Sequence, residues 1–169
     1  MDSVALREKY RQERDKRLRT DGNQQYRRLA GSALADYLAD PYTPKVERDP
    51  KTDHVTFAFI GGGFAGLVTG ARLKEAGITD VRILEKGGDF GGTWYWNRYP
   101  GCQCDVESME YSYQFSEELQ QEWEWSQRYA GQPEILRYAN HVADTFKLRD
   151  HFIFPSCQPK AQTACGCWI

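Results

Sequence analysis

A glycine-rich turn between two apolar runs constrains the fold of this chain more than any other part of its sequence. Residues 59–66 read Phe-Ile-Gly-Gly-Gly-Phe-Ala-Gly, and a second apolar run, Val81–Leu84, leads into Glu85. Apolar runs bounded by turn residues indicate strands, and helical spacing between them indicates a helix. The pattern predicts a buried strand over residues 54–60, a helix over residues 64–76 that stops at Gly77, and a parallel strand over Val81–Leu84. Together these elements form a βαβ unit.

The glycines of this turn have separate expected roles. Gly61 allows a tight turn, Gly63 allows the backbone to approach a pyrophosphate, and Gly66 allows the helix to pack closely on the strand. The helix N-terminus offers N–H donors and the positive end of its dipole to phosphates. Glu85 follows at the end of the second strand, where a carboxylate accepts hydrogen bonds from a ribose diol. The pattern predicts an adenine dinucleotide site; the alternative is a glycine-rich turn without a ligand.

A second glycine turn and a run of aromatic residues follow Glu85. Residues 87–108 read GGDFGGTWYWNRYPGCQCDVES. A simple NAD-binding module has no need of these features. FAD does, because its pyrophosphate and ribityl chain need close backbone approach and its ring needs a flat apolar surface. Gly91 and Gly92 suit the first role and the run 94–96 suits the second, although the aromatic side chains have the alternative of filling a core.

The stretch GGTWYWNRYPGCQCDVES, followed by MEYSYQFSEEL, resembles the FAD-binding half of the Baeyer–Villiger monooxygenases. The resemblance runs from about Thr52 to about Leu148. It implies a flavoprotein that uses FAD, NADPH and dioxygen to convert a small-molecule ketone to an ester or lactone through a C4a-peroxyflavin. The polar leader LREKYRQERDKRLRTDGNQQY resembles the extension of larger members that act on bulky cyclic, steroidal or terpenoid ketones, which implies a role in secondary metabolism, in terpenoid or polyketide biosynthesis.

The resemblance also implies roles for single residues. Along the FAD it places Gly61, Gly63, Ala65, Gly66 and Gly92 at the pyrophosphate, Glu85 at the adenosine ribose, and Thr93, Trp94, Tyr95, Trp96 and Tyr111 at the ribityl chain and flavin. It places Gln103 and Cys104 near the nicotinamide, although the family usually has a basic residue where this chain has Gln103. Asp105 is the implied catalytic residue, because it would hold an arginine beside the flavin. A carboxylate at that position needs a cation, since a buried unpaired charge is costly.

The chain has 169 residues, and full members of the family run to several hundred. They contain a second GxGxxG, for NADPH, preceded by FxGxxxHxxxW, and neither motif is found here. After Phe154 the resemblance ends. We therefore expect a truncated α/β protein: a charged helical extension and linker at 1–50, a partial Rossmann-like FAD-binding domain at 51–154 with a helical insert, and a divergent tail at 155–169. The alternative to an active monooxygenase is an inactive FAD-binding fragment that lacks the NADPH domain.

An incomplete sheet and several helices are expected around the βαβ unit. A third strand is predicted at residues 152–154, which leaves one sheet edge open. In the leader, a helix over 5–19 mixes acidic with basic residues and so favours a solvated helix over a basic patch for a membrane or acidic partner. Ser116 suits the N-cap of a helix that begins at Glu117, and Pro133 suits the first turn of another. The second helix has apolar residues at helical spacing: Ile135, Tyr138, Val142 and Phe146.

Charge and cysteine content bound the remaining classes. The formal net charge of −2 gives no electrostatic case for nucleic acid. No apolar run approaches a membrane span and the N-terminus is charged from Asp2, so we expect a cytoplasmic protein. The pairs Cys102/Cys104 and Cys165/Cys167 could be drawn with Cys157 as a zinc or disulfide framework, but CxC is tighter than the usual CxxC spacing. No metal is therefore expected.

Overall fold

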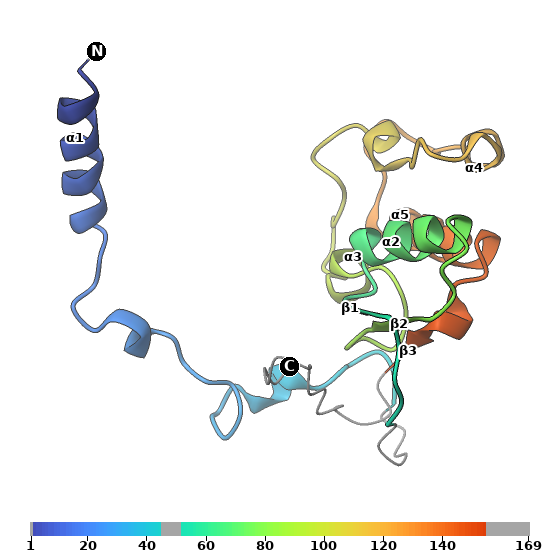
Figure 1. Cartoon of the computed structure of the whole chain (residues 1–169), viewed down its shortest axis with the longest axis horizontal. Helices are drawn as coiled ribbons and strands as arrows, with labels where there is room; N and C mark the ends of the chain where they lie inside the picture. Colours follow the sequence, from blue (N-terminus) through green and yellow to red (C-terminus); the bar gives the residue numbers. More distant parts are fainter. Residues whose placement is uncertain (1, 45–51, 155–169) are drawn as a thin grey trace. The chain divides into compact units, whose positions relative to one another are not determined.

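The computed structural model describes residues 2–44 and 52–154, and the chain divides into two compact units, Met1–Ala39 and Asp40–Ile169. The first unit holds helix α1 (Ser3–Asp15) and two 3₁₀ turns, η1 (Gly22–Gln25) and η2 (Ala35–Leu38) (Figure 1). The second unit holds the remaining elements and the candidate site. Within the described residues, no helix is both long and apolar enough to cross a membrane.

Helix α1 is solvated, as its mixed charges predict. None of its residues is buried, and Arg11 pairs with Glu8 at 2.6 Å and with Asp15 at 3.3 Å. The predicted bounds were wrong at both ends. The helix begins at Ser3 because the carboxylate of Asp2 accepts a hydrogen bond from the Val4 N–H. It ends at Asp15, four residues early. The N–H groups of Arg17 and Leu18 both donate to the Arg14 carbonyl oxygen, at 2.8 and 3.1 Å, which tightens the last turn.

The βαβ unit consists of β1 (Phe57–Ile60), α2 (Phe64–Glu75) and β2 (Val81–Leu84). The two strands are parallel, with Phe57 opposite Val81 and Ile60 opposite Leu84, which confirms the predicted unit. Gly77 follows the helix with a φ of +76°, the left-handed conformation that ends many helices. The N-terminal bound of the first strand was wrong. Thr56 donates through its N–H and hydroxyl to the carboxylate of Asp80, so its N–H takes no part in the ladder.

Strand β1 is also not the buried strand that its apolar sequence predicted. Phe57 is 44% exposed and Ile60 is 52% exposed. The cause lies in the strand order β1-β2-β3, which leaves β1 at an edge of the sheet in the described part of the chain. Burial of a strand depends on what covers and flanks it, and this is not encoded in the strand itself.

The third predicted strand is present as β3 (Phe152–Ile153), one residue shorter than expected. It pairs in parallel with β2, placing Phe152 opposite Ile83 and Ile153 opposite Leu84. The described residues therefore form an α/β fold with a three-stranded parallel sheet, as predicted. Helices α2 and α5 lie on the same side of this sheet (Figure 1).

The helices that follow the glycine turns form where their end signals predict. The short helix α4 (Glu117–Glu122) is capped by Ser116, whose hydroxyl accepts from the Leu119 N–H at 3.2 Å. Helix α5 (Gln132–Thr145) has Pro133 in its first turn and buries a stripe at helical spacing. That stripe includes Ile135, Tyr138 and Val142, as expected, whereas the fourth predicted member, Phe146, is the C-cap and is half-buried.

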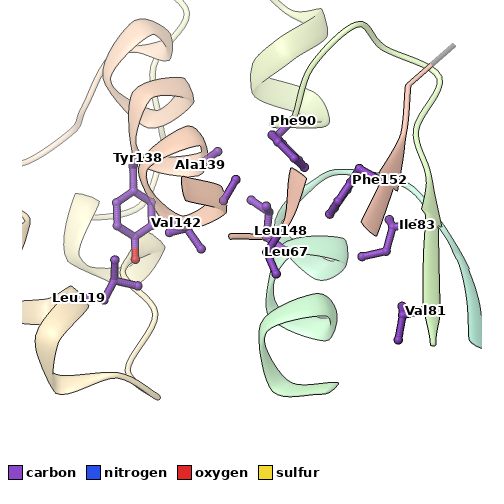
Figure 2. Packing of buried hydrophobic residues seen from close by; sticks show 11 residues of the cluster. Leu67, Val81, Ile83, Phe90, Leu119, Tyr138, Ala139, Val142, Leu148 and Phe152 are labelled. Atoms are coloured by element: carbon purple, nitrogen blue, oxygen red, sulfur yellow. The ribbon is translucent and has the colours of Figure 1, made fainter. Parts of the chain in front are cut away.

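The core joins α2, α5 and the sheet. Figure 2 shows Leu67 of α2 and Leu148 lying between the sheet residue Ile83 and the α5 residues. Phe90 packs edge-on against Phe152, with ring centroids 4.3 Å apart. Because Leu67, Ile83 and Leu148 are fully buried, the core holds α2 firmly against β2 and so fixes the position of the turn between β1 and α2.

Candidate functional site

The first glycine turn brings the end of β1 against the start of α2. Gly61 has a φ of +106°, and its N–H donates to the Leu84 carbonyl oxygen at 2.7 Å. A Cβ on Gly66 would lie 2.0 Å from the Gly61 carbonyl oxygen, so only glycine allows this contact. Gly63 is the N-cap of α2 and supplies no side-chain cap. The N–H groups of the first helical turn are therefore left for another acceptor.

The second glycine turn lies directly against the first. Gly91 and Gly92 have φ values of +122° and +55°, and the Gly91 N–H donates to the Gly62 carbonyl oxygen at 3.0 Å. A Cβ on Gly92 would lie 2.9 Å from the Cα of Gly63. Two turns almost thirty residues apart in sequence thus form one bare backbone surface at the N-terminus of α2.

A pocket of about 480 Å³ opens above this surface. It is lined by Phe59, Ile60, Gly61, Gly63, Phe64, Ala65, Gly66, Gly91, Gly92, Thr93, Trp94 and Tyr111. No lysine or arginine is among these lining residues. An anion bound here would therefore be held by backbone N–H groups and the helix dipole rather than by a basic side chain.

The structure brings together eight of the predicted cofactor-binding residues on the wall of this pocket. They are Gly61, Gly63, Ala65, Gly66, Gly92, Thr93, Trp94 and Tyr111. Gly91, expected with Gly92 to allow close backbone approach, lines it too, and the sequence analysis missed three further lining residues, Phe59, Ile60 and Phe64. Each of these adjoins a predicted glycine or lies within two residues of one, so their position beside the motif was a signal that could have found them.

Glu85 lies behind the first turn and not on the pocket wall. Its side chain is buried, and its carboxylate accepts hydrogen bonds from the backbone N–H groups of Gly62 and Gly87. One bond reaches the first glycine turn and the other reaches the turn that follows β2. The carboxylate therefore ties these two turns together at the end of the sheet.

The predicted aromatic run divides between the pocket and the interior. It forms the short helix α3 (Thr93–Trp96), in which Trp94 faces the pocket and packs edge-on against Tyr111 with ring centroids 5.5 Å apart. Burial, together with the nearby Cys104 and Asp105, raises the pKa of Tyr111. Tyr95 is buried away from the pocket, where its hydroxyl donates to Asp40 at 2.6 Å. Trp96 is half-buried and also lies outside the lining.

The three predicted residues of the segment 103–105 do not line the pocket. Gln103 is exposed and forms an isolated antiparallel bridge with Gly131. Cys104 is buried with a free thiol, and its N–H donates to the Ala130 carbonyl oxygen at 3.0 Å. Asp105 is exposed in this structure. The arginine expected beside this carboxylate stays a prediction.

The part of the chain that the structure describes gives no support to a zinc or disulfide framework of cysteines. Among residues 2–44 and 52–154, no group of three or more His, Cys, Asp or Glu side chains is arranged to hold a metal ion. Cys102 and Cys104 are both free and buried. Cys157, Cys165 and Cys167 lie outside the described residues, as does the predicted tail.

Comparison with the sequences of known proteins gives three findings. A family model described as an NAD(P)-binding Rossmann-like domain matches residues 60–120. A Baeyer–Villiger monooxygenase of Streptomyces coelicolor is 47% identical over 153 residues, which are 89% of this chain and 24% of that protein. Neopentalenolactone D synthase of Streptomyces avermitilis is 46% identical over 151 residues, which are 89% of this chain and 25% of that protein.

A solved structure matches the fold as well as the sequence. The structure of OTEMO in complex with FAD and NADP superposes with a TM-score of 0.56 at 44% identity, over 62% of this chain and 19% of that one. The chain thus spans about a quarter of the length of the curated relatives, at 24% and 25%, and a smaller share of this solved structure.

Proposed function

The chain is a homologue of the Baeyer–Villiger monooxygenases over about a quarter of their length, and we propose that this part holds FAD. One observation carries the proposal: two glycine turns meet at Gly63 and Gly92 and leave bare backbone over the uncapped N-terminus of α2. That surface suits a pyrophosphate, because it offers N–H donors and a positive dipole end without side chains in the way.

The residues of the pocket fit an extended dinucleotide. Gly61 has open space where a Cβ would stand, so a ligand can approach its backbone closely. In this proposal Gly61, Gly63, Ala65, Gly66 and Gly92 hold the pyrophosphate. Thr93, Trp94 and Tyr111 lie on the same wall and would contact the ribityl chain and flavin. The carboxylate of Glu85 would accept hydrogen bonds from the adenosine ribose.

Bound FAD would supply electron transfer and the activation of dioxygen, chemistry that belongs to the cofactor. The residues of the chain bind and orient the cofactor. The apolar rings of Phe64, Trp94 and Tyr111 form a packed cluster, with Phe64 and Tyr111 centroids also 5.5 Å apart, and such a wall excludes water from the bound ring.

For the whole protein, we propose the reaction class of its relatives: NADPH-dependent conversion of a ketone to an ester or lactone with dioxygen. The solved complex with FAD and NADP supports the two cofactors, and the synthase of neopentalenolactone D supports a place in secondary metabolism. Asp105 as a catalytic residue, and Gln103 and Cys104 beside the nicotinamide, stay predictions. So do contacts of Tyr95 and Trp96 with the flavin. The alternative is that this chain alone binds FAD without oxidising NADPH.

Titration of the purified 169-residue chain with FAD, followed by flavin fluorescence, tests the proposal. We expect saturable binding with quenching by the nearby Trp94 and Tyr111. Gly61→Ala should abolish it, because a side chain enters the approach path. Gly101→Ala is the matched control: Gly101 also has a positive φ, +79°, and open space at its Cβ, but it does not line the pocket.

Absence of saturable FAD binding in the wild-type chain would contradict the proposal. Equal FAD affinity of the Gly61→Ala variant and the wild type would contradict the assignment of this pocket. NADPH consumption in the presence of FAD and a ketone, followed by absorbance, then separates the two functions. Consumption above that of free FAD supports an active monooxygenase, and its absence in a chain that binds FAD supports the alternative.

A further inference from the structure

A short segment ahead of the βαβ unit is held tightly by Asp40. We call residues 40–43 the strap. One oxygen of the Asp40 carboxylate, Oδ1, accepts from the N–H groups of Tyr42 at 2.8 Å and Thr43 at 3.2 Å. The other, Oδ2, accepts from the Tyr95 hydroxyl at 2.6 Å and from the Gly88 N–H at 2.8 Å. A single carboxylate therefore fastens the strap both to α3 and to the turn after β2.

Tyr95 and Thr43 enclose that turn from two sides. A Cβ on Gly87 would lie 2.8 Å from ring atoms of Tyr95, and a Cβ on Gly88 would lie 2.2 Å from Oγ1 of Thr43. The Tyr95 hydroxyl also lies 2.8 Å from Thr43 Oγ1 and accepts from the Gly88 N–H at 3.1 Å. Because its proton goes to Asp40, Thr43 is the donor in the first of these bonds. The pair Gly87–Gly88 is thus a packing requirement of the strap.

Arg98 joins the strap to α3 by contacts with Tyr42 and Tyr95. Its guanidinium lies 3.8 Å from the ring centroid of Tyr42, and its Nε donates to the Tyr95 carbonyl oxygen at 3.0 Å. The Tyr42 hydroxyl donates to the Trp96 carbonyl oxygen at 3.0 Å. A cation over an aromatic face is attractive, so these contacts reinforce the bonds of Asp40.

We propose that Asp40 and Tyr95 are positioning residues for the adenosine end of the dinucleotide site. This inference rests on the proposed function. The Gly87 N–H donates to Oε1 of Glu85, and the Gly62 N–H donates to the other oxygen. Both turns therefore set the orientation of the carboxylate, and the strap holds one of them. In this proposal Tyr95 acts through Glu85.

A comparison of three ligands separates positioning from mere stabilisation. FAD and ADP carry adenosine, whereas FMN has the flavin, the ribityl chain and one phosphate without it. A loss of folded protein lowers the apparent affinity for all three ligands. A misplaced Glu85 lowers the affinity for FAD and ADP and leaves that for FMN unchanged.

The variant Tyr95→Phe removes the hydroxyl and keeps the ring against Gly87. The matched control is Tyr138→Phe, which also removes a buried hydroxyl, one that accepts from the Tyr113 N–H at 2.7 Å and not from a residue of the strap. In competition titrations with the full chain, we expect Tyr95→Phe to weaken the affinities for FAD and ADP about fivefold to tenfold relative to that for FMN, the scale of one typical hydrogen bond. Tyr138→Phe should leave the three affinities in their wild-type ratio.

Each outcome decides between the two proposals. A wild-type chain without saturable FAD binding removes the proposed function and this inference with it. A wild-type chain that binds FAD, with an unchanged ratio in Tyr95→Phe, overturns the inference alone. Asp40→Asn and Thr43→Val repeat the comparison with smaller changes, so it remains decisive if Tyr95→Phe does not fold. If FMN does not bind, the absolute ADP affinity replaces the ratio, and an unchanged value in Asp40→Asn overturns the inference.

Discussion

Replacing Gly66 with alanine should both destabilise the protein and remove cofactor binding. The new Cβ would lie 2.0 Å from the Gly61 carbonyl oxygen, and ordinary contact begins at 3.4 Å. Gly61 cannot move away, because its N–H is bonded to the Leu84 carbonyl oxygen. Helix α2 must shift instead, and it is packed on a fully buried core. Overpacking costs about 1–3 kcal/mol, and contact with backbone places this substitution at the upper end, about 3 kcal/mol, while alanine gains about 1 kcal/mol of helix propensity. We expect a net loss of about 2 kcal/mol.

Urea unfolding followed by tryptophan fluorescence measures this loss. With a slope of about 1–2 kcal/mol per M, the midpoint should fall by about 1–2 M. Gly70→Ala, one turn along the same helix, is the control. Its Cβ would meet only methyl ends, Ile83 Cδ1 at 3.0 Å and Leu148 Cδ2 at 3.4 Å, which can give way. That variant should stay within about 1 kcal/mol of the wild type. An unchanged midpoint and FAD affinity for Gly66→Ala would refute the steric reasoning.

Three further predictions use other contacts. Glu85→Gln replaces a carboxylate that accepts from two backbone N–H groups, so FAD affinity measured by fluorescence titration should fall about tenfold. Burial raises the pKa of Asp40, but hydrogen bonds from the Tyr95 hydroxyl and three N–H groups outweigh it and leave the pKa below its ordinary 3.8. The contribution of Asp40 to the free energy of unfolding is therefore present above pH 3.8 and is lost as the pH falls through the lower pKa of the folded state. Between pH 7 and pH 2, the free energy of unfolding should fall more steeply for the wild type than for Asp40→Asn, as measured by urea unfolding. Ser116→Ala removes the α4 cap and should cost about 1 kcal/mol locally, measured as faster amide exchange at Leu119.

Elements that carry their own signals could be predicted from the sequence. Helix α5 has a proline in its first turn and a stripe at helical spacing, and α4 has Ser116 before its first acidic residues. The glycine turn was likewise predictable, since Gly66 and Gly61 meet within one local motif. The burial of β1 was not. An apolar strand is expected to be buried, but the exposure of Phe57 depends on which strands flank it, and that is a property of distant sequence.

The contacts of the strap also depend on residues distant in sequence, and so only part of them could be predicted. The turn itself was readable, because an aspartate followed by proline favours a local bond such as that from the Tyr42 N–H to Asp40. Its partner was not, because Tyr95 lies 55 residues further along the chain. A motif resemblance assigned the whole run 94–96 to one ligand surface. A four-residue helix cannot present three consecutive side chains to the same side, since neighbouring residues point about 100° apart. Trp94 therefore faces the pocket while Tyr95 turns inward, where the only nearby carboxylate that accepts from its hydroxyl among the described residues is Asp40.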